Sequence, residues 1–118
     1  MTGLTIVLVA TDDARVRAAL TLACAQAALG GRVRLFAQDA AVVALGAQPR
    51  DDDAPATPER PDRRQLLALA RQSGVALIAC QTGLAETGLA IDALAEGTEG
   101  GGLVGLLATL GEDRLVVV

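Results

Sequence analysis

The fold is decided by the run Leu4-Thr-Ile-Val-Leu-Val-Ala10 near the start of the chain. This run has the length of a strand, is rich in β-branched residues and carries no charge, which is typical of a strand buried on both faces of a parallel sheet. The polar residues 11–13 follow it and offer an N-cap and negative charge for the first turn of a helix. We expect that helix to continue to about Leu29 and to end at the glycine pair 30–31.

Strand and helix patterns alternate along the rest of the chain. We expect further strands over 32–37, 75–79 and 114–118, and helices over 39–45, from Asp62 to Gly74 with a capping box to Gln65, and over 82–96 with a break near Gly88. This order predicts one α/β domain that spans residues 1–118. We expect a mainly parallel sheet of about five strands with helices on both faces.

The segment Gln48–Pro61 interrupts this pattern. It holds all four prolines of the chain and the acidic run Asp51-Asp52-Asp53. Such a composition buries too little apolar surface to order itself, which predicts a flexible loop over 48–61, inserted in the domain. Two roles stay open for it: a surface loop with no further function, or a mobile lid near the active face.

The first predicted helix indicates self-association. Between Ala18 and Leu29 only Thr21 and Gln26 are polar, so almost no face of this helix is built for water. A helix that is apolar nearly all round is normally covered on more than one side. The sheet can cover one side, and we expect a second subunit to cover the other.

The residue types missing from the chain exclude several chemistries. It has no His, Lys, Trp or Tyr, and all ten basic residues are Arg. Without His there is no Ser-His-Asp triad, no Cys-His pair and no imidazole metal site, and without Lys there is no Schiff base or Walker lysine. We therefore expect no metal site. Phe36 is the only aromatic residue and the net charge is -4, so we expect no nucleic-acid partner either.

The N-terminal residues bear on where the protein works. Residues 1–3 carry no charged leader region, and the apolar run 4–10 is too short to cross a membrane. We therefore expect a cytoplasmic protein with no membrane partner. Thiols stay reduced in that compartment, so each cysteine is expected to be either a small core residue or a reactive group.

Cys80 is the main candidate for chemistry. It stands at the C-terminal end of the predicted strand 75–79, and reactive groups gather at the carboxyl ends of parallel strands. A helix is expected to begin just beyond it, where free N–H groups and the helix dipole favour a thiolate. The same placement suits an inert buried thiol, so both interpretations stay open. Cys24 lies mid-helix among alanines and is interpreted as a packing residue, with a resolving thiol as the alternative.

Polar residues beside the strand ends are the further site candidates. Gln81 and Thr82 follow Cys80 directly, and Thr11 and Asp12 follow the first predicted strand. Because the carboxyl ends of parallel strands meet at one edge of the sheet, we predict these four as binding residues. Asp12 equally suits the cap of a helix.

The three glycines 100–102 are a weaker motif. They do not form a G-x-G-x-x-G or Walker pattern. We interpret them as a tight turn, with an anion-binding nest as the alternative.

The region around Cys80 resembles a known family. The run Gly74-Val-Ala-Leu-Ile-Ala-Cys80-Gln81-Thr82, followed by Gly88-Leu89, Gly97 and Gly101-Gly102-Leu103, resembles the DsrE/DsrF/TusD-like (DsrEFH-like) sulfur-relay family. The front half agrees, with an Ala-rich helix followed by Ala28-Leu29-Gly30-Gly31-Arg32-Val33-Arg34-Leu35-Phe36. The resemblance covers nearly the whole chain outside the proline-rich segment.

The resemblance implies a small three-layer α/β/α domain, flavodoxin-like in outline, that assembles into homotrimers or homohexamers. It also implies that the cysteine matching Cys80 carries a persulfide, with sulfur donor and acceptor proteins as partners and no cofactor. The resulting hypothesis is a persulfide carrier or sulfurtransferase-type protein that uses Cys80. The alternative is a non-catalytic module that binds a small anion or nucleotide, or that serves assembly, with Cys80 as an inert lining residue.

Overall fold

Five parallel strands form the sheet in the structure, a computed structural model that describes residues 2–118. The strands are β1 (Leu4–Leu8), β2 (Val33–Ala37), β3 (Ala76–Cys80), β4 (Glu99–Gly101) and β5 (Arg114–Val117). Their order across the sheet is β4-β3-β2-β1-β5, and every neighbouring pair is parallel. The predicted α/β fold with a parallel sheet of about five strands is therefore confirmed.

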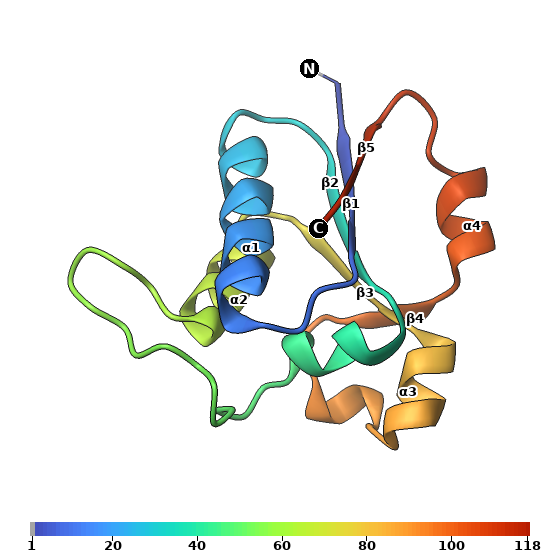
Figure 1. The fold of residues 1–118 in the computed structure, drawn as a ribbon. Helices are drawn as coiled ribbons and strands as arrows, with labels where there is room; N and C mark the ends of the chain where they lie inside the picture. Colours follow the sequence, from blue (N-terminus) through green and yellow to red (C-terminus); the bar gives the residue numbers. More distant parts are fainter. Residues whose placement is uncertain (1) are drawn as a thin grey trace.

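Helices lie on both faces of this sheet (Figure 1). They are α1 (Asp13–Ala28), α2 (Arg63–Gln72), α3 (Gln81–Thr87) and α4 (Leu103–Ala108), with 3₁₀ turns η1 (Asp39–Leu45) and η2 (Ile91–Ala93). The chain steps from β1 to β2 to β3 in one direction and returns to β5 in the other. Since crossovers are right-handed, opposite steps place their helices on opposite faces: α1 and α2 lie on one face and α4 on the other.

The helix ends follow the signals in the sequence. Asp12 caps α1 by accepting a hydrogen bond from the Arg15 N–H at 3.1 Å. Asp62 and Gln65 form the predicted capping box of α2. Gly88 ends α3 in the left-handed conformation, with φ at 72°, as expected for a helix break there.

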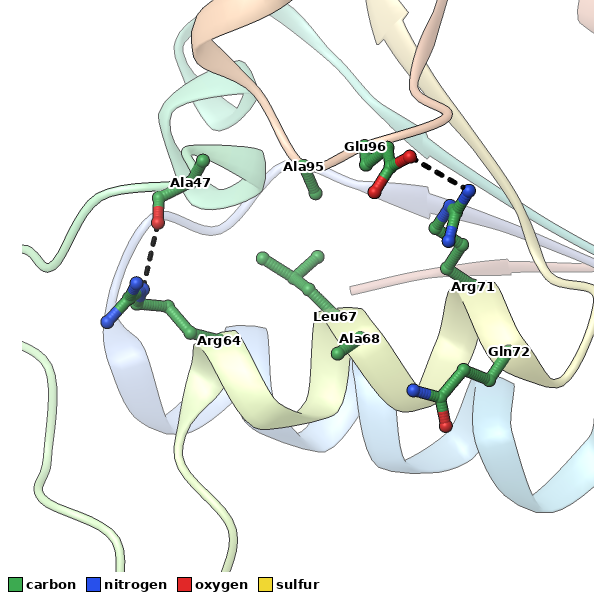
Figure 2. A pocket seen from close by; sticks show the side chains of 8 residues that line it. All are labelled: Ala47, Arg64, Leu67, Ala68, Arg71, Gln72, Ala95 and Glu96. Carbon is green, nitrogen blue, oxygen red and sulfur yellow. Dashed lines mark hydrogen bonds and ion pairs between the residues drawn. The ribbon is translucent and has the colours of Figure 1, made fainter.

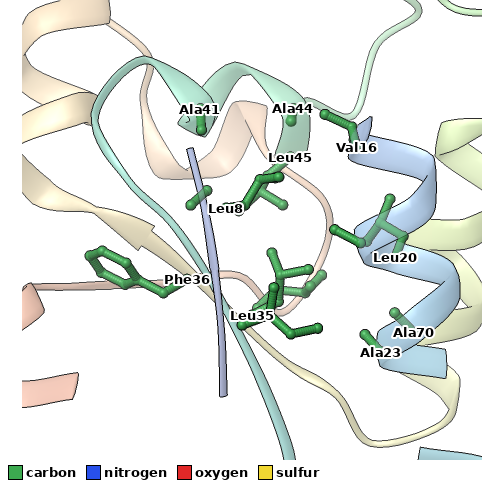
Figure 3. Close-up of a cluster of buried hydrophobic side chains, with 14 of the residues drawn as sticks. Leu8, Val16, Leu20, Ala23, Leu35, Phe36, Ala41, Ala44, Leu45 and Ala70 are labelled. Atoms are coloured by element: carbon green, nitrogen blue, oxygen red, sulfur yellow. The ribbon is translucent and has the colours of Figure 1, made fainter. Parts of the chain in front are cut away.

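The core lies between the sheet and the α1–α2 layer. Figure 3 shows Leu8, Leu35 and Leu45 pointing toward α1 and α2, whereas Phe36 points to the opposite face of the sheet. All five residues of β1 are buried, as predicted for a strand covered on both faces. The strand ends at Leu8, two residues earlier than expected, and Val9 beyond it is 50% exposed.

The glycine run contains the edge strand of the sheet. Residues 99–101 form β4, and none of the three glycines 100–102 has a positive φ, so the tight turn and the nest are both wrong. A side chain at Gly101 would place its Cβ 2.8 Å from the Ile78 Cγ2 atom of β3. This close approach favours glycine at position 101, whereas a Cβ at Gly100 or Gly102 would have room.

The second cover of α1 is a helix of the same chain. α2 packs along α1, and the Cys24 thiol lies 3.8 Å from the Leu66 carbonyl oxygen. This packing leaves Leu22 and Leu29 exposed on the outer side of α1, among small alanines. The apolar faces of α1, which suggested a contact with a second subunit, are thus covered in large part by other elements of the same chain.

α4 is fixed to the sheet by a buried arginine. The Arg34 guanidinium of β2 donates hydrogen bonds to the Thr5 hydroxyl, the Thr109 hydroxyl and the Leu106 carbonyl. Burial, and then the nearby Arg32, lower the pKa of Arg34. Asp113 lies between these two arginines, and its hydrogen bond from Arg32 is the main reason that its pKa is lowered.

No helix within residues 2–118 is both long and apolar enough to cross a membrane.

A second arginine, Arg63, holds the start of the proline-rich segment. Its fully buried guanidinium donates to the carbonyls of Ala44, Gly46 and Gln48 and to both carboxylate oxygens of Asp53, at 2.7–3.1 Å. These bonds use all five of its N–H groups. The hydrogen bond from Arg63 is the main cause of the lowered pKa of Asp53. The flexibility expected for 48–61 stays a prediction, and it concerns mainly the part beyond this anchor.

We predict that Arg63→Ala lowers the free energy of unfolding by about 3–5 kcal/mol, because it leaves buried carbonyls and the Asp53 carboxylate without their partner. Urea titration followed by circular dichroism measures this change. The matched control is Arg64→Ala. The Arg64 side chain is exposed and donates a hydrogen bond to the Ala47 carbonyl. We expect the control to cost less than about 1 kcal/mol. Equal losses in the two variants would contradict the anchoring role.

Candidate functional site

The candidate site lies at the edge of the sheet where β1, β2 and β3 end. Because these strands are parallel and adjacent, the residues that follow them meet along one side of the molecule. Cys80 is the last residue of β3, and Asp39 follows the end of β2 by two positions. η1 and α3 lie beside each other at this edge (Figure 1).

Cys80 occupies the N-cap position of α3. Its Sγ atom accepts a hydrogen bond from the Gly83 N–H at a distance of 3.4 Å. A side-chain oxygen usually fills this role, so the sulfur here takes the place of the capping hydroxyl or carboxylate. The residue is only 8% exposed. A donated N–H at the start of a helix stabilises negative charge on the sulfur.

Asp39 is the second polar group at the sulfur. The Cys80 thiol donates toward its Oδ1 atom, with 3.9 Å between sulfur and oxygen. Asp39 has φ at 49°, and the structure places no other non-glycine residue of 2–118 in the left-handed region. The sequence patterns did not single out this residue. The available signal was its place just after the second predicted strand, at the same edge as Cys80.

Gly83 allows α3 to approach η1 this closely. A Cβ atom on Gly83 would collide with the carbonyl oxygen of Asp39 and approach the Val42 side chain. Glycine therefore lets one N–H reach the sulfur while the aspartate lies on its other side. Cys80, Gly83 and Asp39 form the candidate site.

Two of the predicted binding residues lie in the first turn of α3. Gln81 and Thr82 are both exposed. The Gln81 side chain lies over β4, where a Cβ on Gly100 would be 3.6 Å from its Cγ atom. Within residues 2–118 neither side chain has a hydrogen bond to Cys80.

The other two predicted binding residues lie beyond β1, on the same edge. Asp12 caps α1 and pairs with Arg15 at 3.2 Å. The Thr11 carbonyl accepts a hydrogen bond from Arg50 at 3.3 Å. In the described part of the chain neither residue has a hydrogen bond to Cys80, so the structure joins Cys80 to Asp39 instead.

Cys24 has a different environment. Its side chain is buried in the α1–α2 contact, and this burial raises the pKa of the thiol. A raised pKa keeps the thiol protonated and makes it a poor nucleophile. Both cysteines are free, and Cys24 serves as a small packing residue in the core.

The structure also has a cavity of about 330 Å³ away from Cys80, between α2 and the segment after η2 (Figure 2). Arg64 and Arg71 stand at its ends, bonded to the Ala47 carbonyl and the Glu96 carboxylate. Leu67 and small side chains line the space between them. Both arginines already have acceptors, which weakens this cavity as an anion site. Within residues 2–118 no group of three side chains of metal-binding type gathers to hold an ion.

Comparison with known proteins agrees with this architecture. A sequence model of the DsrE/DsrF-like family matches residues 4–118. The chain belongs to the DsrE/DsrF-like family. The resemblance predicted from the residues around Cys80 is thus confirmed.

Two solved structures show the same fold as this DsrE-like chain. The ychN protein from E. coli is 24% identical, with a TM-score of 0.78 and coverage of 100% of both chains. MTH1491 from Methanobacterium thermoautotrophicum, described as a protein of unknown function, is 16% identical, with a TM-score of 0.62 and coverage of 98% of this chain and 99% of that one. No curated protein matches the sequence.

We predict opposite effects for two glycine substitutions in this DsrE-like chain. Gly83→Ala forces η1 and α3 apart and lowers the free energy of unfolding by about 1–3 kcal/mol. It also raises the rate at which iodoacetamide alkylates Cys80, because the sulfur loses its cover. Gly105→Ala, in the interior of α4 with open space around a Cβ, raises stability by up to about 1 kcal/mol. Urea titration and peptide mass spectrometry measure both effects, and an unchanged Gly83→Ala variant would contradict the close packing.

Proposed function

We propose that this DsrE-like chain is a persulfide carrier of sulfurtransferase type and that Cys80 carries the sulfur. The hydrogen bond from the Gly83 N–H to the Cys80 Sγ atom is the observation that supports it most. It favours an anionic sulfur at the strand end where reactive groups of parallel sheets gather. Membership of the DsrE/DsrF-like family adds to this support.

The proposed reaction is sulfur transfer in two substitutions. The Cys80 thiolate attacks the outer sulfur of a donor persulfide, R–S–SH, and a new S–S bond forms as the donor S–S bond breaks. The departing R–S group takes up a proton and leaves as a thiol. In the second step an acceptor thiolate attacks the outer sulfur of Cys80–S–SH and restores the Cys80 thiol. The substitutions balance without a metal or an organic cofactor.

The proposal assigns donor and acceptor contacts to the edge of the sheet. Gln81 and Thr82 are exposed next to Cys80 and are proposed to contact the partner molecule first. Thr11 and Asp12, exposed farther along the same edge, are proposed to extend that contact. The partners are sulfur donor and acceptor proteins in the cytoplasm, where the two free cysteines stay reduced.

We predict that glutathione hydropersulfide adds one sulfur to the protein and that the addition depends on Cys80. Intact-protein mass spectrometry compares the wild type with Cys80→Ser and with Cys24→Ser as the matched control. The added mass is expected to disappear only in Cys80→Ser. No adduct, or equal adducts at both cysteines, would contradict the carrier and favour the module that binds an anion or nucleotide, or that serves assembly.

We also propose that the chain forms a homotrimer or homohexamer through the α4 side of the sheet. α4 has only six residues, too few to cover this face. The exposed apolar surface here, called the α4 surface, consists of Val9, Leu103, Val104, Leu107, Leu115 and Val117. An apolar group of this extent is typical of a protein contact, and a second copy of the same uncharged surface is a suitable partner.

We predict that Val104→Asp shifts the assembly to monomers. Val104 is 86% exposed in the single chain, so the substitution leaves the monomer fold intact and places a charge inside the contact. Size-exclusion chromatography with light scattering measures the mass. Leu22→Asp, on the outer side of α1, is the control and is expected to leave the assembly unchanged. If Leu22→Asp alone dissociates it, the contact lies on α1 instead.

A further inference from the structure

We propose that Asp39 determines which sulfur donors reach Cys80. It disfavours donors with negative charge beside the reacting sulfur, such as thiosulfate or polysulfide dianions, and favours donors that are protonated there, such as a hydropersulfide in its R–S–SH form. This inference rests on the proposed function of Cys80. It adds to that function a specificity-determining residue and a discrimination among sulfur donors by their charge.

The position of the carboxylate carries the argument. Cys80 is 8% exposed, whereas Asp39 is exposed and its Oδ1 atom lies 3.9 Å from the sulfur. Asp39 is thus at the solvent side of a nearly buried thiol. A donor that reaches the sulfur passes close to this carboxylate.

Among the described residues, the charge of Asp39 has no neutralising partner. Asp13 pairs with Arg17, and Asp53 pairs with Arg63. Across residues 2–118, by contrast, no arginine forms an ion pair with Asp39. The negative charge therefore acts on molecules that approach Cys80.

The backbone keeps the carboxylate in place. Asp39 holds φ at 49°, a conformation that aspartate and asparagine tolerate better than most residues. The preceding residue is fixed by the hydrogen bond from the Gln38 N–H to the Leu8 carbonyl at 2.9 Å. Gly83 packs directly against the Asp39 carbonyl from the other side. These contacts restrict the backbone that carries the Asp39 side chain.

The same carboxylate can take part in the proton balance with a neutral donor. The Cys80 thiol donates toward Asp39, so the carboxylate can take the proton that leaves as the thiolate forms and attacks R–S–SH. The departing R–S group then takes that proton, so the products are Cys80–S–SH and R–SH. A dianionic donor instead brings charge toward Asp39. The repulsion between two unit negative charges about 4 Å apart lowers the rate of attack about fivefold even in water-like surroundings.

The test compares two methanethiosulfonate reagents of similar size that transfer a sulfur-linked group to a thiol. One ends in a sulfonate and the other in a trimethylammonium group. In a Cys24→Ala background, the rate constant of Cys80 with each reagent is measured by mass spectrometry and divided by that of free cysteine. We expect Cys80 to prefer the cationic reagent over the anionic one by about fivefold or more.

The decisive variant is Asp39→Asn, which removes the charge and suits the left-handed backbone. We expect this variant to lower the preference about fivefold, toward that of free cysteine. Glu86→Gln is the matched control, because Glu86 is an exposed carboxylate on α3 without a hydrogen bond to Cys80. It is expected to keep the preference. An unchanged ratio in Asp39→Asn, or an equal fall in Glu86→Gln, overturns the role of Asp39.

The experiments distinguish a failure of the selection by Asp39 from a failure of the carrier function. Loading by glutathione hydropersulfide is measured on the same proteins. Charge preference without loading rejects the carrier and, with it, the assignment of a sulfur donor. Loading without charge preference keeps the carrier and rejects only the selection by Asp39. A Cys80 that reacts with neither reagent in any variant overturns both.

Discussion

Parallel pairing of the buried strands β1 and β2 is the constraint on which the rest of the structure depends. Parallel strands need a crossover between them, so the chain must leave and re-enter the sheet at opposite edges. That requirement brings the ends of β1, β2 and β3 to one edge. It also demands cover on both faces, which α1 and α2 supply on one side and the six-residue α4 supplies only in part on the other. The candidate site and the α4 surface both follow from this arrangement.

The Cys80 sulfur has two polar neighbours with opposite effects on a negative charge at the sulfur. The Gly83 N–H favours negative charge on Cys80, and the unpaired Asp39 carboxylate opposes it. The Cys24 thiol has a different setting: it lies 3.8 Å from the Leu66 carbonyl oxygen, and burial raises its pKa. The two side chains have similar exposed fractions, so the polar groups beside each sulfur are needed to distinguish a candidate reactive group from a packing residue.

Local sequence patterns predicted most helices and strands, whereas they could not predict contacts between distant segments. The run 4–10, the capping box at Asp62 and the break at Gly88 depend on neighbouring residues, and the structure agrees with them within two positions. Asp39 lies 41 positions from Cys80, so only the folded chain shows their contact. In the sequence Arg63 looks like an ordinary surface charge in the first turn of a helix, where the helix dipole disfavours a cation. Its buried role depends on five acceptor atoms from residues 44–53, which only the folded chain brings to it.

The anchor at Arg63 divides the proline-rich segment into two parts with different tolerance for change. Residues 44–53 surround a buried charge, so a change in their length removes acceptors from it. In the described chain, the hydrogen bonds of residues 55–61 stay inside that stretch, between Thr57 and Arg60 and from Arg60 to Pro55. The point between Pro55 and Arg60 is therefore where evolution or an engineer can lengthen this domain, or insert another one, without disturbing its core.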